Sequence, residues 1–269
     1  MDFKGKIAVV TGGASGIGLA CCQEFAERGA AVAVVDVDVK TGGRVVEDLR
    51  RQGATSEFVR VDVSQRAQVE QGVAEIVARL GGIDILVNNA GIQRYATATT
   101  CSEEEWDEVL GINLKGAFLM AKYVIPEMLR RGGGAVVITG SVQSVTAMRN
   151  SVHYVVSKHG LLGLTRCIAL DYAKQNIRAN LVMPGAIDTP LLRGAIALDP
   201  HPERVREACD RLHARGKMGK PEEVAHVIVF LASDLASFMT GAAVAVDGGL
   251  LVPAGGMAFQ ESGTGAVKV

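Results

Sequence analysis

The sequence predicts an α/β fold with one doubly wound parallel sheet of about seven strands, helices on both faces and a small helical lobe. Three observations predict it: apolar runs rich in Val, Ile and Ala alternate with longer amphipathic segments, a glycine-rich turn follows the first run, and the second run ends in Asp36. Strands buried on both faces and separated by helices form parallel sheets with right-handed crossovers. This architecture is Rossmann-type, and its ligands bind beyond the carboxyl ends of the strands.

The first strand, expected at 6–11, runs directly into a glycine-rich turn and a helix over 16–28. The turn reads Thr11-Gly12-Gly13-Ala14-Ser15-Gly16-Ile17-Gly18. Its backbone N–H groups and the positive helix end suit a pyrophosphate, and glycines let the phosphates and the helix approach. A P-loop would need Gly-Lys-Ser/Thr after the last glycine, where this chain has Leu19. We therefore expect a dinucleotide at Gly12, Ser15, Gly16, Ile17 and Gly18.

The second strand, expected at 30–36, ends in an acidic residue. Asp36 lies 18 residues after Gly18, close to the spacing at which a carboxylate meets the ribose of a dinucleotide. Because it accepts hydrogen bonds from the 2′- and 3′-hydroxyls and repels a 2′-phosphate, Asp36 favours NAD. The alternative interpretation is a structural turn followed by a solvated Asp.

The alternation of short apolar and longer amphipathic segments continues after Asp36. Further strands are expected at 56–62, 83–88, 134–140, 177–183 and 242–247, and further helices at 40–52, 65–80, 103–130 (as two helices), 152–174 and 221–233.

The alternation breaks at residues 187–219, where Pro190, Pro200 and Pro202 bound two short helical patterns. An insertion over the ligand edge is usually a substrate lobe or lid. We expect a single dinucleotide-binding catalytic domain over 1–250 that includes this lobe. The C-terminal tail, 251–269, is either disordered or docked on a neighbouring subunit.

Composition excludes several classes of function. The 269 residues are 48% hydrophobic with a net charge of −1, which allows a large core and disfavours nucleic acid as a partner. No apolar stretch has the length of a membrane span, and the run before Thr11 is too short for a signal peptide. The five cysteines are odd in number and lack a metal spacing, so we expect reduced thiols, a cytoplasmic protein and no metal.

Tyr154 and Lys158 stand four residues apart, which places them on one face of the helix expected at 152–174. Free tyrosine has a pKa of about 10 and is a poor base near neutral pH. A neighbouring ammonium group and a positive nicotinamide ring would favour the phenolate, so Tyr154 is a candidate general base. The alternative is an incidental Tyr–Lys pair on an amphipathic helix.

Two polar residues complete the candidate catalytic group. Ser141 follows the strand at 134–140, so its hydroxyl can hold the substrate oxygen. Asn113 is a polar residue within an apolar helical pattern. It could accept a local kink and order a water that links Lys158 to solvent. The alternative is a buried amide that forms hydrogen bonds with backbone groups.

Over residues 4–250 the chain resembles the short-chain dehydrogenase/reductases. The matching motifs are Thr11-Gly-x3-Gly16-x-Gly18, Asp62-Val63, Asn88-Asn89-Ala90-Gly91, Asn113, Ser141, Tyr154-x3-Lys158, Pro184-Gly185 and Asp247-Gly248-Gly249. The resemblance implies a catalytic tetrad of Asn113, Ser141, Tyr154 and Lys158, and a homotetramer.

The same resemblance implies further cofactor contacts. Asp62 and Val63 would lie by the adenine, and Asn89, with Ala90 and Gly91, would lie at the central ribose region of the cofactor. Ile187 and Thr189, which follow Pro184 and Gly185, would hold the nicotinamide carboxamide and the diphosphate. Tyr154 and Lys158 would also touch the nicotinamide ribose. Relatives that prefer NADP typically carry Arg or Lys where this chain has Ser15 and Val37, which again favours NAD.

The expected substrate is a small polar molecule. The loops after the fourth to sixth strands carry Gln93, Arg94, Gln143, Arg149, Asn150 and His153, which would suit a polyhydroxylated ligand. The segments 91–94 and 141–150 look similar to family members that oxidise aldoses at the anomeric carbon. We therefore predict an NAD-dependent sugar 1-dehydrogenase that forms a lactone.

Three alternatives stay open. The arginines could instead pair with a carboxylate, which would indicate a hydroxy-acid or deoxy-sugar-acid dehydrogenase. A 3-oxoacyl reductase is disfavoured by the NAD signal, because biosynthetic reductions usually draw on NADPH. A non-catalytic protein that senses NAD belongs to a different class and is disfavoured because all four tetrad residues are present.

Overall fold

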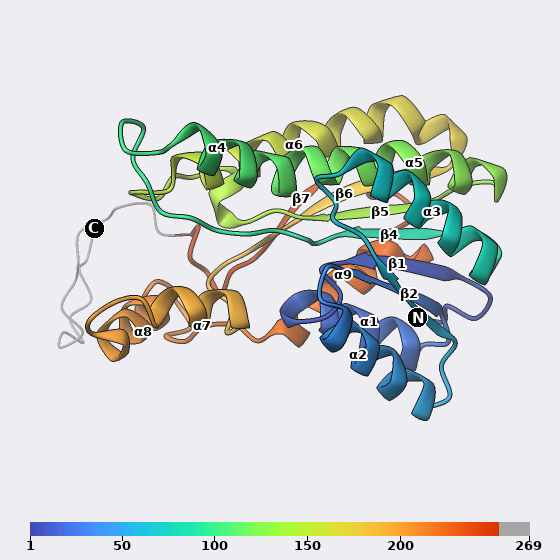
Figure 1. Cartoon of the computed structure of the whole chain (residues 1–269), viewed down its shortest axis with the longest axis horizontal. Coiled ribbons are helices and arrows are strands. Elements are labelled where there is room, and N and C mark those ends of the chain that lie inside the picture. The colour runs from blue at the N-terminus through green and yellow to red at the C-terminus, as the bar shows by residue number, and fades with distance from the viewer. Residues whose placement is uncertain (253–269) are drawn as a thin grey trace, which may run out of the picture.

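Seven parallel strands form one sheet in the computed structural model, which describes residues 1–252 (Figure 1). Their order is β3-β2-β1-β4-β5-β6-β7, so the chain builds outward from β1 to one side and then returns to build the other. The strands are β1 (Ile7–Thr11), β2 (Ala31–Asp36), β3 (Ser56–Arg60), β4 (Ile85–Asn88), β5 (Gly134–Thr139), β6 (Ile177–Pro184) and β7 (Ala243–Val246). The predicted doubly wound α/β fold is thus confirmed.

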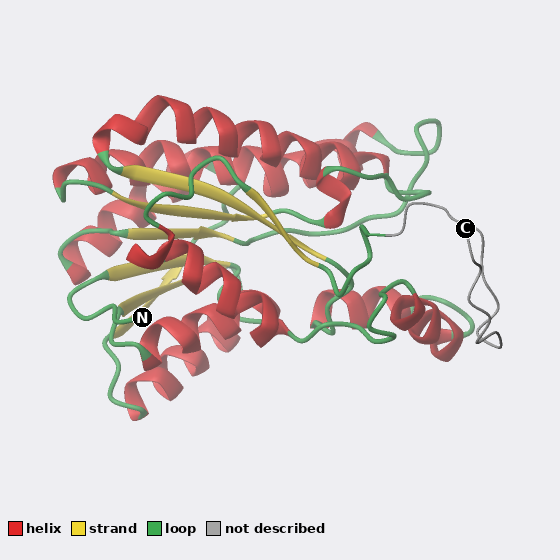
Figure 2. Cartoon of the chain, turned by 180° about the vertical axis from the view of Figure 1, so that it is seen from behind, coloured by secondary structure: helices red, strands yellow, loops and turns green. Residues whose placement is uncertain are grey.

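Helices cover both faces of the sheet (Figures 1 and 2). One face carries α3 (Arg66–Leu80), α4 (Glu103–Leu110), α5 (Gly116–Arg130) and α6 (Val152–Tyr172). The other carries α1 (Gly16–Glu27), α2 (Val39–Arg51) and α9 (Pro221–Ala232).

Alternate strand residues feed two separate cores. Val9 and Val136 pack beneath the layer that includes α3, α5 and α6, whereas their neighbours Val10 and Val137 pack against α1 and α9. This is the period-2 consequence of a pleated strand, and it explains why both faces of these strands are apolar.

The expected helical pair at 103–130 is one continuous stretch in which a π-helix, Gly111–Lys115, joins α4 to α5. This stretch, Glu103–Arg130, has the length and hydropathy of a membrane span, so the sequence-based statement that no segment does was wrong. Half of its most apolar window is buried inside the protein. Its apolarity is explained by packing, since Leu119, Met120 and Val124 belong to the core.

Two short helices, α7 (Pro190–Ile196) and α8 (Pro202–Arg211), form the predicted helical insertion. Each begins with a proline in its first turn, where the missing N–H costs nothing. In Figure 1 they lie beyond one end of the sheet, apart from the two helical layers. Because α7 follows β6, this is the end at which the strands finish. The prediction for the tail falls outside the described residues apart from Leu251 and Val252.

Candidate active site

A cavity of ≈ 840 Å³ opens where the strands end, between the sheet and the α7–α8 lobe. Its walls come from the loops after β1 to β6 and from the lobe. Among the predicted site residues, those on its walls are Gly12, Ser15, Gly16, Ile17, Asp36, Asp62, Val63, Asn89, Ala90, Gly91, Gln93, Ser141, Gln143, Tyr154, Lys158, Pro184, Gly185, Ile187 and Thr189.

The glycine-rich turn has the backbone shape that its sequence predicts. Gly12 and Gly16 adopt left-handed φ angles of 63° and 54°, which side chains disfavour. Gly18 lies off the cavity, and a Cβ there would sit 2.0 Å from the Gly12 carbonyl oxygen. Gly18 therefore lets α1 pack against the turn rather than touching a ligand.

Two groups in the cavity suit a negatively charged or polar ligand. The first turn of α1 carries no acidic residue, so its backbone N–H groups face the cavity uncompensated. The Asp36 carboxylate accepts one backbone hydrogen bond on each oxygen, from Ala14 N (3.1 Å) and Asp38 N (3.1 Å). Each oxygen keeps acceptor capacity for a diol.

The turn is fixed to the end of β4 by a small network. Thr11 Oγ1 accepts from the backbone N–H groups of Asn89 (2.9 Å) and Ala90 (3.0 Å). In return, Asn89 Nδ2 donates to the carbonyl oxygen of Thr11 (3.1 Å). The central part of the cavity is therefore preorganised by residues that the sequence places 78 positions apart.

Tyr154, Ser141 and Lys158 meet at the deep part of the cavity. The Lys158 Nζ lies 5.5 Å from the centre of the Tyr154 ring and donates to the carbonyl oxygen of Thr139 at 2.9 Å. Ser141 Oγ accepts from Gln143 N (3.1 Å), which leaves its hydroxyl hydrogen free to donate. That hydroxyl acts on the Tyr154 phenol and lowers its pKa.

Burial is the largest influence on the pKa values of Tyr154 and Lys158. It raises the pKa of Tyr154 to about 12, a shift that the Ser141 hydrogen bond opposes and the neighbouring Tyr95 reinforces. Burial also lowers the pKa of Lys158 to about 8, because a charged ammonium loses its hydration. The sequence analysis expected the Lys158 ammonium and a positive nicotinamide ring to favour the phenolate; it did not take into account that desolvation raises the pKa of the phenol.

Asn113 is buried in the π-helix and lies behind the cavity wall rather than on it. Its Oδ1 accepts from Ile92 N (2.8 Å), and its Nδ2 donates to Ile92 O (2.9 Å) and to Ser157 Oγ (3.1 Å). The side chain thus clamps the loop after β4 to α6, and both of its N–H donors are used. The kink that the sequence suggested at Asn113 is present as the π-helix at Gly111–Lys115. Both N–H donors of the Asn113 side chain bind protein atoms.

Four of the six predicted substrate residues do not reach the cavity wall. Arg94 pairs with Glu108 at 3.0 Å on the exterior, and Arg149 and Asn150 lie exposed in the loop before α6. His153 is fully buried, but its ring turns away from the cavity. Of the set, Gln93 and Gln143 line the cavity.

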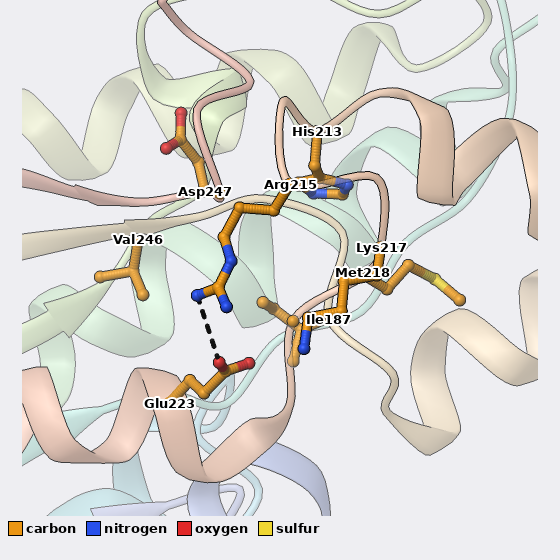
Figure 3. Close-up of a pocket in the computed structure, with 10 residues that line it drawn as sticks. Ile187, His213, Arg215, Lys217, Met218, Glu223, Val246 and Asp247 are labelled. Atoms are coloured by element: carbon orange, nitrogen blue, oxygen red, sulfur yellow. Dashed lines mark ion pairs between the residues drawn. The ribbon is translucent and has the colours of Figure 1, made fainter.

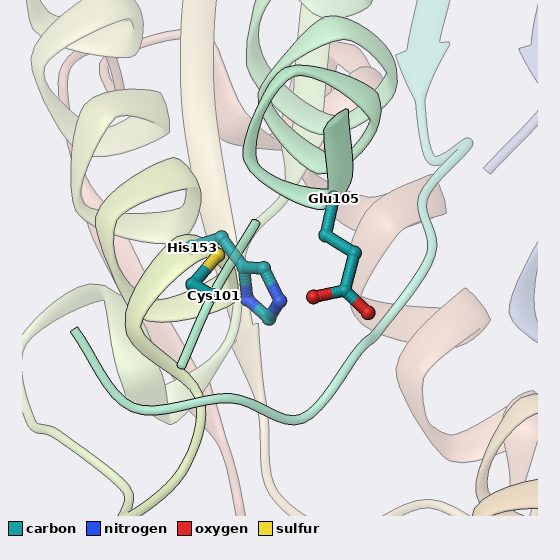
Figure 4. A group of neighbouring side chains, drawn as sticks. All are labelled: Cys101, Glu105 and His153. Atoms are coloured by element: carbon teal, nitrogen blue, oxygen red, sulfur yellow. The ribbon is translucent and has the colours of Figure 1, made fainter. Parts of the chain in front are cut away.

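The His153 ring instead caps its own helix. Its Nδ1 accepts from the backbone N–H of Tyr154 at 2.9 Å, which places the proton of the neutral ring on Nε2. That Nε2 is buried without a partner and lies in a group with Cys101 and Glu105, whose ligand atoms are all within 4.8 Å of one another (Figure 4). A metal on Nε2 would move the proton to Nδ1 and break the cap on Tyr154, so the hydrogen bond argues against a metal there.

His213 is a supporting residue that the sequence reasoning missed. Buried at the junction of lobe and sheet, it lines a smaller cavity of ≈ 160 Å³ with Glu223 and Arg215, which form an ion pair across it (Figure 3). His213 Nε2 accepts from Ala186 N (3.0 Å), and Nδ1 contacts the Cys209 carbonyl oxygen at 2.9 Å. The ring thus ties α8 to the loop after β6.

His213 also explains two glycines of the sequence motifs. A Cβ at Gly185 would lie 2.6 Å from His213 Nε2, and one at Gly248 would lie 3.3 Å from its Cβ. In the sequence His213 is a histidine within the inserted segment, and no motif or residue spacing links it to the other site residues. Only the packing against Gly185 and Gly248 assigns it a role.

The sequence analysis predicted that the lobe lies over the ligand edge, but it did not name the lobe's apolar side chains. They extend the cavity wall opposite the sheet and comprise Leu191, Leu192, Ile196, Leu198, Val205 and Leu212. The available signal was their recurrence through the two short helices and the residues that follow each of them.

The residues present fit a nicotinamide dinucleotide. Asp36 and Thr139 mark the two ends of a trough across the ends of β2, β1, β4 and β5, which spans about 14 Å at the usual strand spacing. At one end of the trough lies the Asp36 carboxylate, which suits a diol, and in the middle lies the N-terminus of α1. At the other end lies Thr139 Oγ1, a buried atom that has no hydrogen-bond partner among the described residues. These are the donor and acceptor types that ribose, pyrophosphate and carboxamide require.

Comparison with known proteins places the chain among enzymes. The family model described as enoyl-(acyl carrier protein) reductase matches residues 12–251. The chain is 38% identical to the NAD-dependent glycerol dehydrogenase of Listeria innocua (94% of this chain, 100% of that protein) and 37% identical to the cyclohexanol dehydrogenase of Acinetobacter sp. (91% and 95%). A solved structure of Thermoplasma acidophilum aldohexose dehydrogenase matches with a TM-score of 0.85 at 37% identity, covering 94% of this chain and 96% of that one.

Proposed function

The chain belongs to the short-chain dehydrogenase/reductase family, which acts on CH–OH groups with NAD(P), and on that premise we propose an NAD-dependent dehydrogenase of a secondary alcohol or lactol. The observation that carries the proposal is the meeting of Ser141, Tyr154 and Lys158 at one end of a trough whose other end is Asp36. The bound nicotinamide supplies the acceptor for the hydride that leaves the carbinol carbon.

The protein residues handle the proton. In the oxidative direction, the Ser141 hydroxyl holds the substrate oxygen and the Tyr154 phenolate removes its proton, and the reverse direction returns it. The ammonium of Lys158, 5.5 Å from the ring centre, favours the phenolate by its charge. Asn113 acts through position, because it holds the loop after β4 and Ser157, whose Oγ in turn donates to the Tyr154 carbonyl oxygen at 2.7 Å.

Preference for NAD rests on the charges of the cavity wall. Among the described lining residues the basic one is Lys158, at the far end of the trough from Asp36, so nothing on the wall beside Asp36 would neutralise a 2′-phosphate. Val37, on the wall next to Asp36, adds no charge.

For the substrate, sugar oxidation was the prediction from sequence. Two of the six polar residues behind it line the cavity, and relatives named for glycerol, aldohexoses and cyclohexanol are similar to the chain at 37–38% identity. The proposal therefore stops at the CH–OH group. NADH absorbance on mixing the protein with NAD and a panel of sugars, hydroxy acids and secondary alcohols tests it; NAD binding without turnover of any of them would favour the sensor alternative.

We further propose a cytoplasmic homotetramer that associates through the long helices at 103–130 and 152–174 and through the last strand. Support comes from apolar side chains left on the outer surfaces of these helices, with Leu170 of α6 82% exposed and Phe118 of α5 48% exposed. Light scattering of the dilute protein tests the assembly, and a stable monomer would contradict it.

A further inference from the structure

We propose that the substrate is a neutral secondary alcohol, or its ketone, whose body is hydrocarbon rather than polyhydroxylated or charged. The inference rests on the proposed function, because it concerns the cavity next to Tyr154. It is carried by the side chains on the wall of the cavity that holds Tyr154.

Three separate segments supply apolar side chains to the wall of this cavity. The loop after β4 contributes Ile92 and the ring of Tyr95, and the loop after β5 contributes Val142 and Met148. The lobe closes the third side, with Leu192 of α7 and Leu212 after α8 among its contributors. Segments that are far apart in sequence therefore present the same chemistry to one space.

Polar groups at this end are too few for a sugar. Apart from Ser141 and Tyr154, the loops after β4 and β5 contribute the amides of Gln93 and Gln143 and the hydroxyl of Tyr95, and the lobe contributes Cys209 and Asp199. The Gln143 carbonyl already lies 3.5 Å from Thr146 Oγ1 as an acceptor. Each substrate hydroxyl enclosed without a partner weakens binding by about tenfold, so several would abolish useful affinity.

Charge on the wall also disfavours an acidic substrate. Lys158, the basic side chain among the described lining residues, already donates to Thr139. The lobe contributes the carboxylate of Asp199, which would repel a substrate carboxylate. The arginine that could have paired with one, Arg94, is held outside the wall by Glu108.

The lobe offers apolar surface that a hydrocarbon body would cover. Leu198 is 80% exposed and Leu212 56% exposed although both line the cavity. Each methylene that a ligand buries against such surface strengthens binding about fourfold. A six-carbon hydrocarbon ring would thus bind more tightly through contact with this wall, whereas a polyol would bind more weakly because its hydroxyls lack hydrogen-bond partners there.

A series on one ring isolates the effect of polarity. Cyclohexanol, trans-1,2-cyclohexanediol, myo-inositol and 4-hydroxycyclohexanecarboxylate share a six-membered ring and differ in hydroxyl number and charge. We expect kcat/KM with NAD to fall at least tenfold from cyclohexanol to the diol, and to be undetectable for inositol and at least a hundredfold lower for the acid. 2-Octanol in a parallel arm distinguishes a ring from a chain as the hydrocarbon body.

Substitutions of the apolar lining residues test whether the cavity wall causes the preference for a hydrocarbon substrate. Met148→Gln and Leu192→Gln should each lower kcat/KM for cyclohexanol about tenfold while changing the value for the diol less. Leu235→Gln, at an exposed leucine (70%) outside the cavity, is the matched control and should leave both unchanged.

Direct binding gives a readout independent of turnover. With NADH present, cyclohexanone should raise the thermal unfolding midpoint and myo-inosose, the inositol ketone, should not. Faster oxidation of glucose or inositol than of cyclohexanol would overturn the inference and leave the proposed function standing. Absence of both turnover and cyclohexanone binding would also overturn it, whereas the proposed function fails only if no alcohol of any class yields NADH.

Discussion

The ammonium of Lys158 lies 5.5 Å from the centre of the Tyr154 ring, and its hydrogen bond goes to the carbonyl oxygen of Thr139, the last residue of β5. The helix that carries both side chains is thereby tied to the strand whose continuation carries Ser141. This cation therefore links α6 to the end of β5, and it is also the basic residue of the described cavity wall.

Replacing Tyr154 with Phe removes the phenol and keeps the ring. Because proton transfer by a positioned side chain contributes about 10²–10⁴-fold, we expect kcat to fall by that factor. Fluorescence titration should show NADH affinity within about twofold of the wild type. A parallel loss of NADH affinity and turnover would mean that Tyr154 is structural.

Replacing Asp36 with Ala should reverse the cofactor preference. Hydrogen bonds to a charged acceptor are worth about 1.5–3 kcal/mol, so kcat/KM for NAD should fall about 10–100-fold while that for NADP rises. Asp38→Ala is the matched control, since Asp38 caps α2 through Thr41 N (3.0 Å) and lies outside the cavity wall. Unchanged NAD preference in Asp36→Ala would refute the assignment.

Lys158→Met tests the cost of the buried charge. The folded pKa of about 8 lies below the ordinary value of 10.5, so the unfolded chain binds more protons between these limits and stability rises with pH across this window. This net lowering of the pKa corresponds to a loss of about 3 kcal/mol in folding stability below pH 8. We expect the inactive variant to unfold at higher urea at pH 7 and this advantage to shrink by pH 10.

A gap in stability between Lys158→Met and the wild type that stays constant from pH 7 to pH 10 would contradict a lowered Lys158 pKa. Tyr154, with its pKa raised to about 12, weakens the fold of both proteins above about pH 10, so the comparison is made below that value.

His213→Phe removes the acceptor for the Ala186 N–H while keeping a ring between Gly185 and Gly248. A buried donor left unpaired costs about 1–3 kcal/mol, and the urea midpoint should fall accordingly. Because the loop after β6 and the lobe both lose their link, we expect KM for the alcohol to rise more than kcat falls. His159→Ala, at an exposed histidine of α6, should change neither, and an unaltered KM in His213→Phe would show that the link has no part in the site.

Local pattern was sufficient for the features that depend on neighbouring residues. The period of buried strands predicted the sheet, and the glycines at 12, 16 and 18 predicted the turn, because left-handed backbone and close approach follow from residue type. Tyr154 and Lys158 share a helix face by spacing alone. Ser141 and Asp36 follow strands, and parallel strands end at a common edge.

Side-chain direction in the loops was not predictable in this way. Arg94 lies near the active site in sequence yet pairs with Glu108, and His153 turns its ring back onto the N–H of Tyr154. Both outcomes depend on partners that become neighbours only after the helices pack. His213 reaches Ala186 across 27 residues for the same reason.

The order of residues by itself determined the sheet, the edge where the cavity opens, and the acid, hydroxyl, phenol and amine gathered there, because each follows from a repeat or spacing within one element. Tertiary structure decided which loop side chains face the cavity, how far burial opposes ionisation of Tyr154, and that the lobe lines the cavity with hydrocarbon. Those properties depend on contacts between segments far apart in the chain, and such contacts exist only in the folded protein.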